Sequence, residues 1–135
     1  MMRVHHVGWL VKRIEIAATD FEKLGFSRDG AVCRDTMRGI DVLFMSCAHQ
    51  RIELVSPYCE NSIVADLMKR YKNSPYHMCL ITDNIEQSMK DLEKNGFGRI
   101  SDIAPAPAID GKNVVFLINS EMGMIELVEE TGDRI

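Results

Sequence analysis

A segment near the start of the chain is repeated in its second half. Residues 6–28 return at 77–99 with a shift of 71 positions, and nine of the 23 positions carry the same residue. The run IELV at 52–55 recurs at 125–128 with a shift of 73. An internal repeat of this length predicts two copies of one supersecondary unit.

Both copies show the same order of β-prone and helical segments. The first copy predicts a strand at 4–11, a helix at 14–24 and further strands at about 26–34, 39–46 and 50–56. The second copy predicts a strand at 76–82, a helix at 84–95 and strands near 97–103, 113–119 and 123–130. The order predicts an α+β fold made of two tandem βαβββ modules, whose curved mixed sheet surrounds a cleft.

The segments between these elements complete the expected organisation. We expect one domain over 1–135, with modules at 1–58 and 75–131 joined by a linking helix at 61–72, capped by Asn61 or Ser62. Glycines at the ends of the two repeated helices, Gly25 and Gly96, stand where a left-handed residue is favoured. The stretch 104–111 contains two prolines and is predicted to be a loop that differs between the copies.

Two histidines and two glutamates occupy matching positions of the repeat. The pairs are His6 with His77 and Glu53 with Glu126. Side chains alternate between the faces of a strand, so all four point away from the helix-packing face if the larger apolar residues face the helices. A buried carboxylate needs a partner or a metal ion, because burying it alone costs several kcal/mol. The four residues therefore predict a site for one divalent ion.

Composition excludes some other functions. A net charge of −4 argues against a broad nucleic-acid surface. The apolar run near the amino terminus is too short for a signal peptide or a membrane span, so we expect no membrane association. The four cysteines lack the spacing of a metal-binding motif, which is typical of reduced thiols. The expected location is therefore the cytoplasm.

Four stretches of the chain together resemble one protein family. They are HHVGWLV…FEKLGF, RIELVSP, YHMCLITDNIEQSMKDLEKNGF and VVFLINS…GMIELVEE. This pattern resembles the vicinal oxygen chelate superfamily, which includes glyoxalase I, methylmalonyl-CoA epimerase, extradiol dioxygenases and bleomycin-type resistance proteins. The resemblance implies paired βαβββ modules and one divalent ion (Zn, Ni, Co, Mn or Fe) per cleft, with His6, Glu53, His77 and Glu126 as ligands. It also favours a homodimer.

The layout around the linking helix is similar to methylmalonyl-CoA epimerase. The resemblance implies an isomerase or lyase that abstracts a proton next to a carbonyl and stabilises the enediolate or enolate with the metal. We favour Glu126 as the base, with Glu53 as its partner. The substrate would be a small molecule: an acyl-CoA, a glutathione adduct or a small oxo or hydroxy acid.

Three alternatives remain open at this stage. The chain could be a glyoxalase I-like lactoylglutathione lyase, although Leu10 and Pro57 stand where bacterial glyoxalases tend to carry glutathione-binding Arg and Asn. It could be a non-catalytic, resistance-type binding protein, or an Fe(II) dioxygenase using His6, His77 and Glu126.

Nearby polar residues have other expected roles. His5 is expected to support the site or the fold, and His49 to lie in a hydrated hairpin turn. The strand-borne glutamate that some epimerases use as a base would fall near Val42. Asp41 is one residue away and is expected to face the opposite side of the strand.

Overall fold

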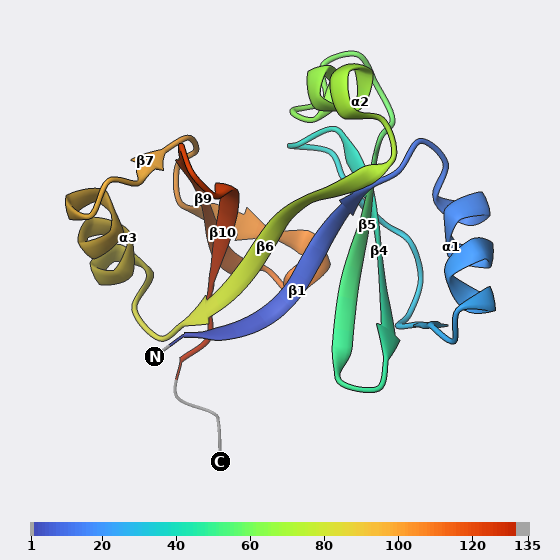
Figure 1. Cartoon of the computed structure of the whole chain (residues 1–135), viewed down its shortest axis with the longest axis horizontal. Helices are drawn as coiled ribbons and strands as arrows, with labels where there is room; N and C mark the ends of the chain where they lie inside the picture. The colour runs from blue at the N-terminus through green and yellow to red at the C-terminus, as the bar shows by residue number, and fades with distance from the viewer. Residues whose placement is uncertain (1, 132–135) are drawn as a thin grey trace. The chain divides into compact units, whose positions relative to one another are not determined.

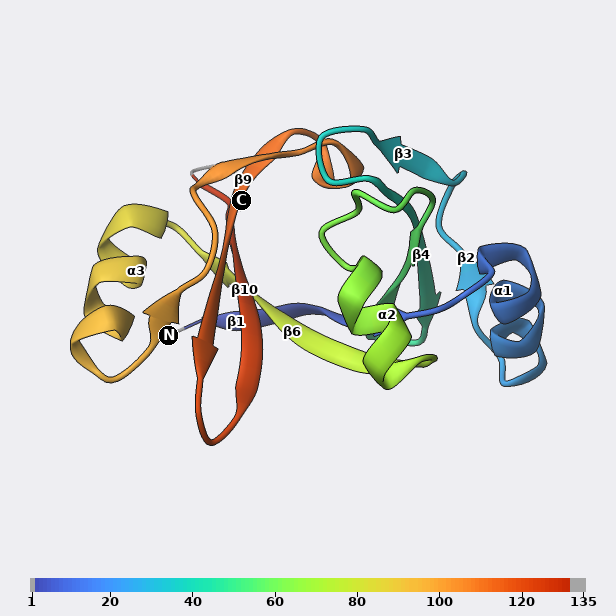
Figure 2. The ribbon, with the colours of Figure 1, turned by 90° about the horizontal axis from the view of Figure 1, so that it is seen from above.

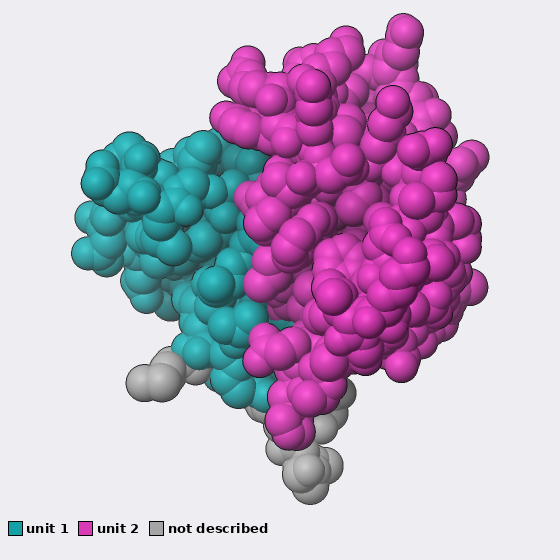
Figure 3. All heavy atoms as spheres, turned by 45° about the vertical axis from the view of Figure 1, so that its right-hand side comes forward, with its two compact units in different colours: residues 1–5, 77–135 teal, residues 6–76 magenta. Residues whose placement is uncertain are grey.

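The chain divides into two units in the computed structural model, which describes residues 2–131. One unit holds residues 6–76 and the other holds residues 1–5 and 77–135 (Figure 3). The divisions fall inside the strands β1 (Arg3–Leu10) and β6 (Ser74–Thr82), so each strand contributes to both units (Figure 1). Met1 and residues 132–135 of the expected domain lie outside the described residues.

The unit of residues 6–76 contains a mixed sheet and a helix beside it. After β1 come α1 (Ile14–Lys23), β2 (Ser27–Arg28), β3 (Cys33–Asp35), β4 (Ile40–Cys47), β5 (Gln50–Pro57) and α2 (Ala65–Tyr71). The strand order is β2-β4-β5-β1, with β3 also paired to β4. Strand β1 runs parallel to β5, whereas β4 and β5 form an antiparallel hairpin.

The unit of residues 1–5 and 77–135 repeats this arrangement. After β6 come α3 (Ile85–Lys94), β7 (Gly98–Arg99), β8 (Ala104–Ala106), a short 3₁₀ helix (Pro107–Ile109), β9 (Lys112–Asn119) and β10 (Gly123–Glu129). The order is β6-β10-β9-β7, with β8 paired to β9, and β6 runs parallel to β10. Figure 2 shows α3 on the side of β9 and β10, the strands of its own unit. In the other unit, α1 lies beside β2. The predicted α+β class and the βαβββ order are confirmed.

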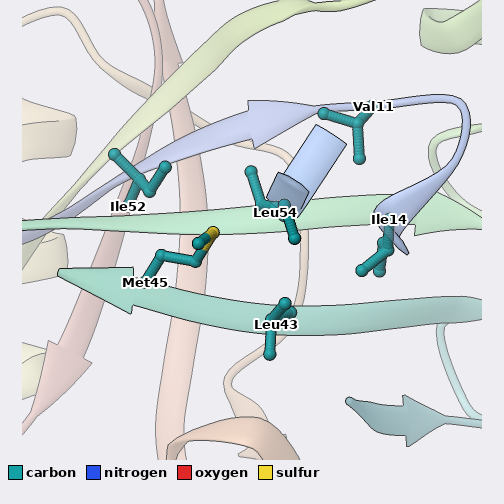
Figure 4. Packing of buried hydrophobic residues seen from close by; sticks show 7 residues of the cluster. Val11, Ile14, Leu43, Met45, Ile52 and Leu54 are labelled. Carbon is teal, nitrogen blue, oxygen red and sulfur yellow. The ribbon is translucent and has the colours of Figure 1, made fainter. Parts of the chain in front are cut away.

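One face of each sheet packs against the helix of the same unit. In the unit of residues 6–76, apolar side chains from β4, β5 and the start of α1 point toward one another (Figure 4). This cluster contains Val11, Ile14, Ala18, Leu43, Met45, Ile52 and Leu54. The second unit has an equivalent cluster of Ile85, Met89, Val115, Leu117, Ile125 and Leu127. Alternate residues of each strand are therefore held on the opposite face, called here the site face.

Three of the predicted elements are corrected by the structure. The single strand expected at 26–34 is two short strands, β2 and β3, because the chain turns between them at Gly30 (φ 92°). The strand expected at 97–103 is reduced to β7. The loop expected at 104–111 begins with β8, since Pro105 lies on an edge strand where a missing N–H is tolerated. Strand β8 is the counterpart of β3, so this segment does repeat.

The helix ends follow the sequence more closely. Both Gly25 (φ 103°) and Gly96 (φ 94°) adopt the left-handed conformation. The Asn84 side chain accepts a hydrogen bond from the Gln87 N–H at the start of α3. Helix α2 is shorter than the predicted 61–72, and Ser62 Oγ accepts from the Val64 N–H just ahead of it. No helix within residues 2–131 is long and apolar enough to cross a membrane.

The core of the unit of residues 6–76 makes a direct prediction about stability. Leu54 is completely buried in the cluster beneath α1. Leu54→Ala should lower the free energy of unfolding by about 3 kcal/mol, because it removes packed methyl groups and leaves a cavity. Chemical denaturation monitored by circular dichroism measures the change. Leu24→Ala, at a side chain that is mostly exposed, is the matched control and should change stability little. Equal effects of the two substitutions would contradict the described packing.

Candidate metal centre

His6 and Glu53 meet on the site face of the unit of residues 6–76. They come from the neighbouring parallel strands β1 and β5, and the His6 Nε2 atom lies 3.4 Å from Glu53 Oε1. Both residues are buried, at 1% and 7% exposure. They lie on this face because Val11, Ile52 and Leu54, at alternating positions, pack under α1. The predicted orientation of this pair is confirmed within the unit.

His77 and Glu126 form the same contact in the second unit. They come from the parallel strands β6 and β10, and His77 Nε2 lies 3.0 Å from Glu126 Oε1. Both are buried, at 5% and 3% exposure. Ile125 and Leu127 point to the α3 side, which leaves Glu126 on the site face. Each unit thus carries one buried imidazole against one buried carboxylate.

The donor atoms of each pair are spaced as two ligands of one ion would be. Atoms bound at about 2.1 Å to a common ion lie about 3.0 Å apart at a right angle and about 3.4 Å apart at the tetrahedral angle. The observed separations are 3.0 Å and 3.4 Å. Imidazole and carboxylate together suit Zn, Ni, Co, Mn and Fe, so the residues present fit a divalent metal.

A phenylalanine that the sequence analysis missed borders each pair. Phe44 on β4 faces Glu53 across the hairpin, and its ring centroid is 5.2 Å from that of His6 in an edge-on contact. Phe116 on β9 faces Glu126, and its ring lies 5.3 Å from His77 in the same geometry. A signal was present, because VLF at 42–44 and VVF at 114–116 align with a shift of 72. The aromatic rings give each His–Glu pair an apolar wall.

The neighbouring polar residues form contacts of their own. The His5 imidazole is 4.0 Å from the Glu130 carboxylate, which also accepts a hydrogen bond from Lys112 at 3.1 Å. His49 is exposed in the hairpin turn, as predicted. Asp41 is held by Arg34 through two hydrogen bonds of 2.8 and 3.0 Å.

Strand β4 adds no carboxylate to the site face of its unit. Asp41 aligns with Leu43 and Met45 on the helix side, whereas Val42 lies on the site face with Phe44. The expectation that Asp41 faces away is confirmed. Within this unit, Glu53 is therefore the carboxylate that the β4–β5 hairpin places on the site face.

Comparison with known proteins identifies the class. The profile of the Glyoxalase/Bleomycin resistance protein/Dioxygenase superfamily matches residues 5–116, and the chain belongs to this superfamily. The chain is 28% identical over 128 residues to the mitochondrial methylmalonyl-CoA epimerase of Mus musculus, covering 94% of this chain and 71% of the relative.

Solved epimerase structures share the fold. Methylmalonyl-CoA epimerase from Mycobacterium tuberculosis has a TM-score of 0.82 at 18% identity, covering 96% of this chain and 88% of that chain. A methylmalonyl-CoA epimerase in complex with methylmalonyl-CoA and NH4+ has a TM-score of 0.80 at 17% identity, covering 96% and 95%. The resemblance seen in the sequence is confirmed at the level of superfamily and fold.

The contact between Glu130 and Lys112 predicts a titration shift. The Lys112 ammonium lowers the pKa of the Glu130 carboxyl, and the nearby His5 adds to the effect. Lys112→Met should raise this pKa toward its ordinary value, which a carbon-13 NMR titration would measure. Because the folded-state pKa is lowered, the pair contributes roughly 0.5 kcal/mol of stability above about pH 5, and this is lost as the pH falls through the folded-state pKa. An unchanged Glu130 pKa in Lys112→Met would contradict the contact.

Proposed function

We propose that the protein is a divalent-metal-dependent isomerase that moves a proton next to the carbonyl of an acyl-CoA thioester, in the manner of methylmalonyl-CoA epimerase. The observation that carries the proposal is the buried His–Glu pair that recurs in both units. The sequence relative and the solved structures with this fold are named as epimerases of that substrate, which supports the acyl-CoA class. The activity needs no oxidant or reductant, only a Lewis acid and a base.

His6, Glu53, His77 and Glu126 would hold the ion. The support is that each unit forms one His–Glu pair with ligand-like spacing, and that the repeat relates the two pairs. When bound, a divalent ion supplies a Lewis acid that stabilises negative charge on a substrate oxygen. His and Glu ligands accept several divalent metals, so elemental analysis of the purified protein would identify the ion.

Residues of the chain would supply the base and exclude water. Glu53 and Glu126 are the candidates for taking the proton, since β4 offers Val42 where some epimerases carry a glutamate. Phe44 and Phe116 cover one flank of each pair and keep water from that side. A water-poor surrounding strengthens the electrostatic interactions of the carboxylates and suits proton transfer from carbon.

We further propose that the protein acts in the cytoplasm as a homodimer, in which each chain contains two βαβββ modules. Each of the four cysteines is present as a thiol, which suits a reducing compartment. We also propose that residues 1–135 form one domain, in which modules at 1–58 and 75–131 are joined by the segment 61–72. Analytical ultracentrifugation of the purified chain measures the oligomeric state.

Solvent-deuterium exchange tests the proposed function. Purified protein should carry a divalent metal by elemental analysis and should exchange the hydrogen at carbon 2 of methylmalonyl-CoA in D2O, as followed by mass spectrometry. Removal of the metal with a chelator should reduce exchange to that of protein-free solution, and re-addition should restore it.

The same assay identifies the outcomes that would contradict the proposal. Metal-loaded protein that leaves methylmalonyl-CoA unexchanged but converts the hemithioacetal of glutathione and methylglyoxal would be a lactoylglutathione lyase instead. Protein that binds an acyl-CoA without any exchange would be a binding protein. Either result would refute the isomerase assignment.

A further inference from the structure

The two carboxylates of the site have different neighbours within their sheets. In the parallel pair β1–β5, Gly8 is the residue directly beside Glu53. In the parallel pair β6–β10, Cys79 is the residue directly beside Glu126. Gly8 and Cys79 are equivalent positions of the repeat, each two residues after its histidine. The repeat therefore retains the His–Glu pair but changes the residue beside the glutamate.

This difference affects how closely each glutamate is packed. Facing residues on adjacent strands have side chains roughly 5 Å apart on the same face, close enough to restrict each other's rotamers. The Cys79 side chain is completely buried at the strand position paired with Glu126, and its Sγ atom lies within 4.8 Å of a His5 ring nitrogen, whereas Gly8 has no side chain to place beside Glu53. The opposite flank is alike in both units, since Phe44 faces Glu53 and Phe116 faces Glu126.

The geometry of the two pairs agrees with this difference in packing. The Glu126 side chain is 4% exposed and its oxygen lies 3.0 Å from the His77 nitrogen. The Glu53 side chain is 9% exposed and its oxygen lies 3.4 Å from the His6 nitrogen. Glu126 is thus the more tightly held carboxylate, and Glu53 has the longer contact and the smaller neighbour.

We propose that Cys79 is a positioning residue that fixes Glu126 as a permanent ligand, while Gly8 leaves Glu53 room to turn and act as the base. This inference rests on the proposed function and reverses the sequence-based preference for Glu126. In the step, the C–H bond next to the carbonyl breaks, the proton passes to a Glu53 oxygen, and the electron pair moves toward the carbonyl oxygen. The same carbon then regains a proton from solvent on its opposite face and Glu53 releases its proton to solvent, so no oxidant or reductant is consumed.

A matched pair of glutamine variants tests the assignment of the two carboxylates. Both Glu53→Gln and Glu126→Gln keep the side-chain size and remove the charge. With Co2+ as the probe, Glu126→Gln should weaken binding by about 10- to 100-fold, because it weakens a fixed ligand. Glu53→Gln should weaken binding less, but should lower kcat for deuterium exchange by at least about 100-fold at saturating Co2+, with KM little changed.

Substitutions at Cys79 test its positioning role through a signal independent of turnover. Cys79→Ala removes the buried sulfur, so Glu126 should gain mobility, and Co2+ affinity should fall by about tenfold with a changed visible absorption spectrum. Cys79→Val restores an apolar side chain of similar size and should recover both the affinity and the spectrum. Cys59→Ala is the matched control, since it removes an exposed thiol, and should leave Co2+ binding unchanged. Circular dichroism verifies that each variant is folded.

Two results would overturn the inference while leaving the proposed function intact. The first is exchange that depends on Glu126 more than on Glu53 at saturating Co2+. The second is a folded Cys79→Ala variant with the affinity and spectrum of the unsubstituted protein. If the unsubstituted protein neither binds Co2+ nor exchanges methylmalonyl-CoA, the proposed function is wrong and the inference falls with it.

Discussion

In each unit a buried carboxylate lies against a buried imidazole on the sheet face that points away from the helix. Taking a carboxylate out of water costs several kcal/mol, and the loss of its partner would leave that cost uncompensated. The packing and strand pairing around each pair fix the position of this contact. Apolar residues at alternate strand positions pack under α1 and α3, which directs the glutamates and histidines to the opposite face. Parallel pairing of β1 with β5, and of β6 with β10, then brings each histidine within 3.4 Å of its glutamate, two positions along the strand from the register partner.

The repeat contains residues that serve folding and residues that we propose serve chemistry. Gly25 and Gly96 recur because both helices end in a left-handed residue. Asp20 and Lys23 form an exposed ion pair, so their recurrence adds little to stability. The His–Glu pairs recur with the phenylalanines that border them, whereas Gly8 and Cys79 differ at one equivalent position. In the proposed function, the duplicated fold would provide two similar sets of ligands and give their carboxylates different roles.

Much of this arrangement could be predicted from the sequence, because period-two alternation and the repeat are both visible there. They were sufficient to place His6, Glu53, His77 and Glu126 on one side of their strands, and to place Asp41 on the other. Phe44 and Phe116 were missed because a phenylalanine in an apolar strand has the same pattern whether it faces the core or the site. Strand β8 was missed because its proline indicated a loop, and only the pairing with β9 shows that the position is an edge. Gly8 and Cys79 could not be predicted from the repeat, because these equivalent positions hold different residues and their place beside the glutamates depends on the strand register.

The central proposal is that the two His–Glu pairs serve one metal ion, and its most direct test is the stoichiometry of binding. Calorimetric titration of the metal-stripped protein with Co2+ should give one ion per chain. His6→Ala and His77→Ala, which each remove a ligand from a different pair, should both weaken that single binding event by a large factor. Two ions per chain, with each substitution abolishing only one of two independent events, would contradict the claim and show that each unit binds metal on its own.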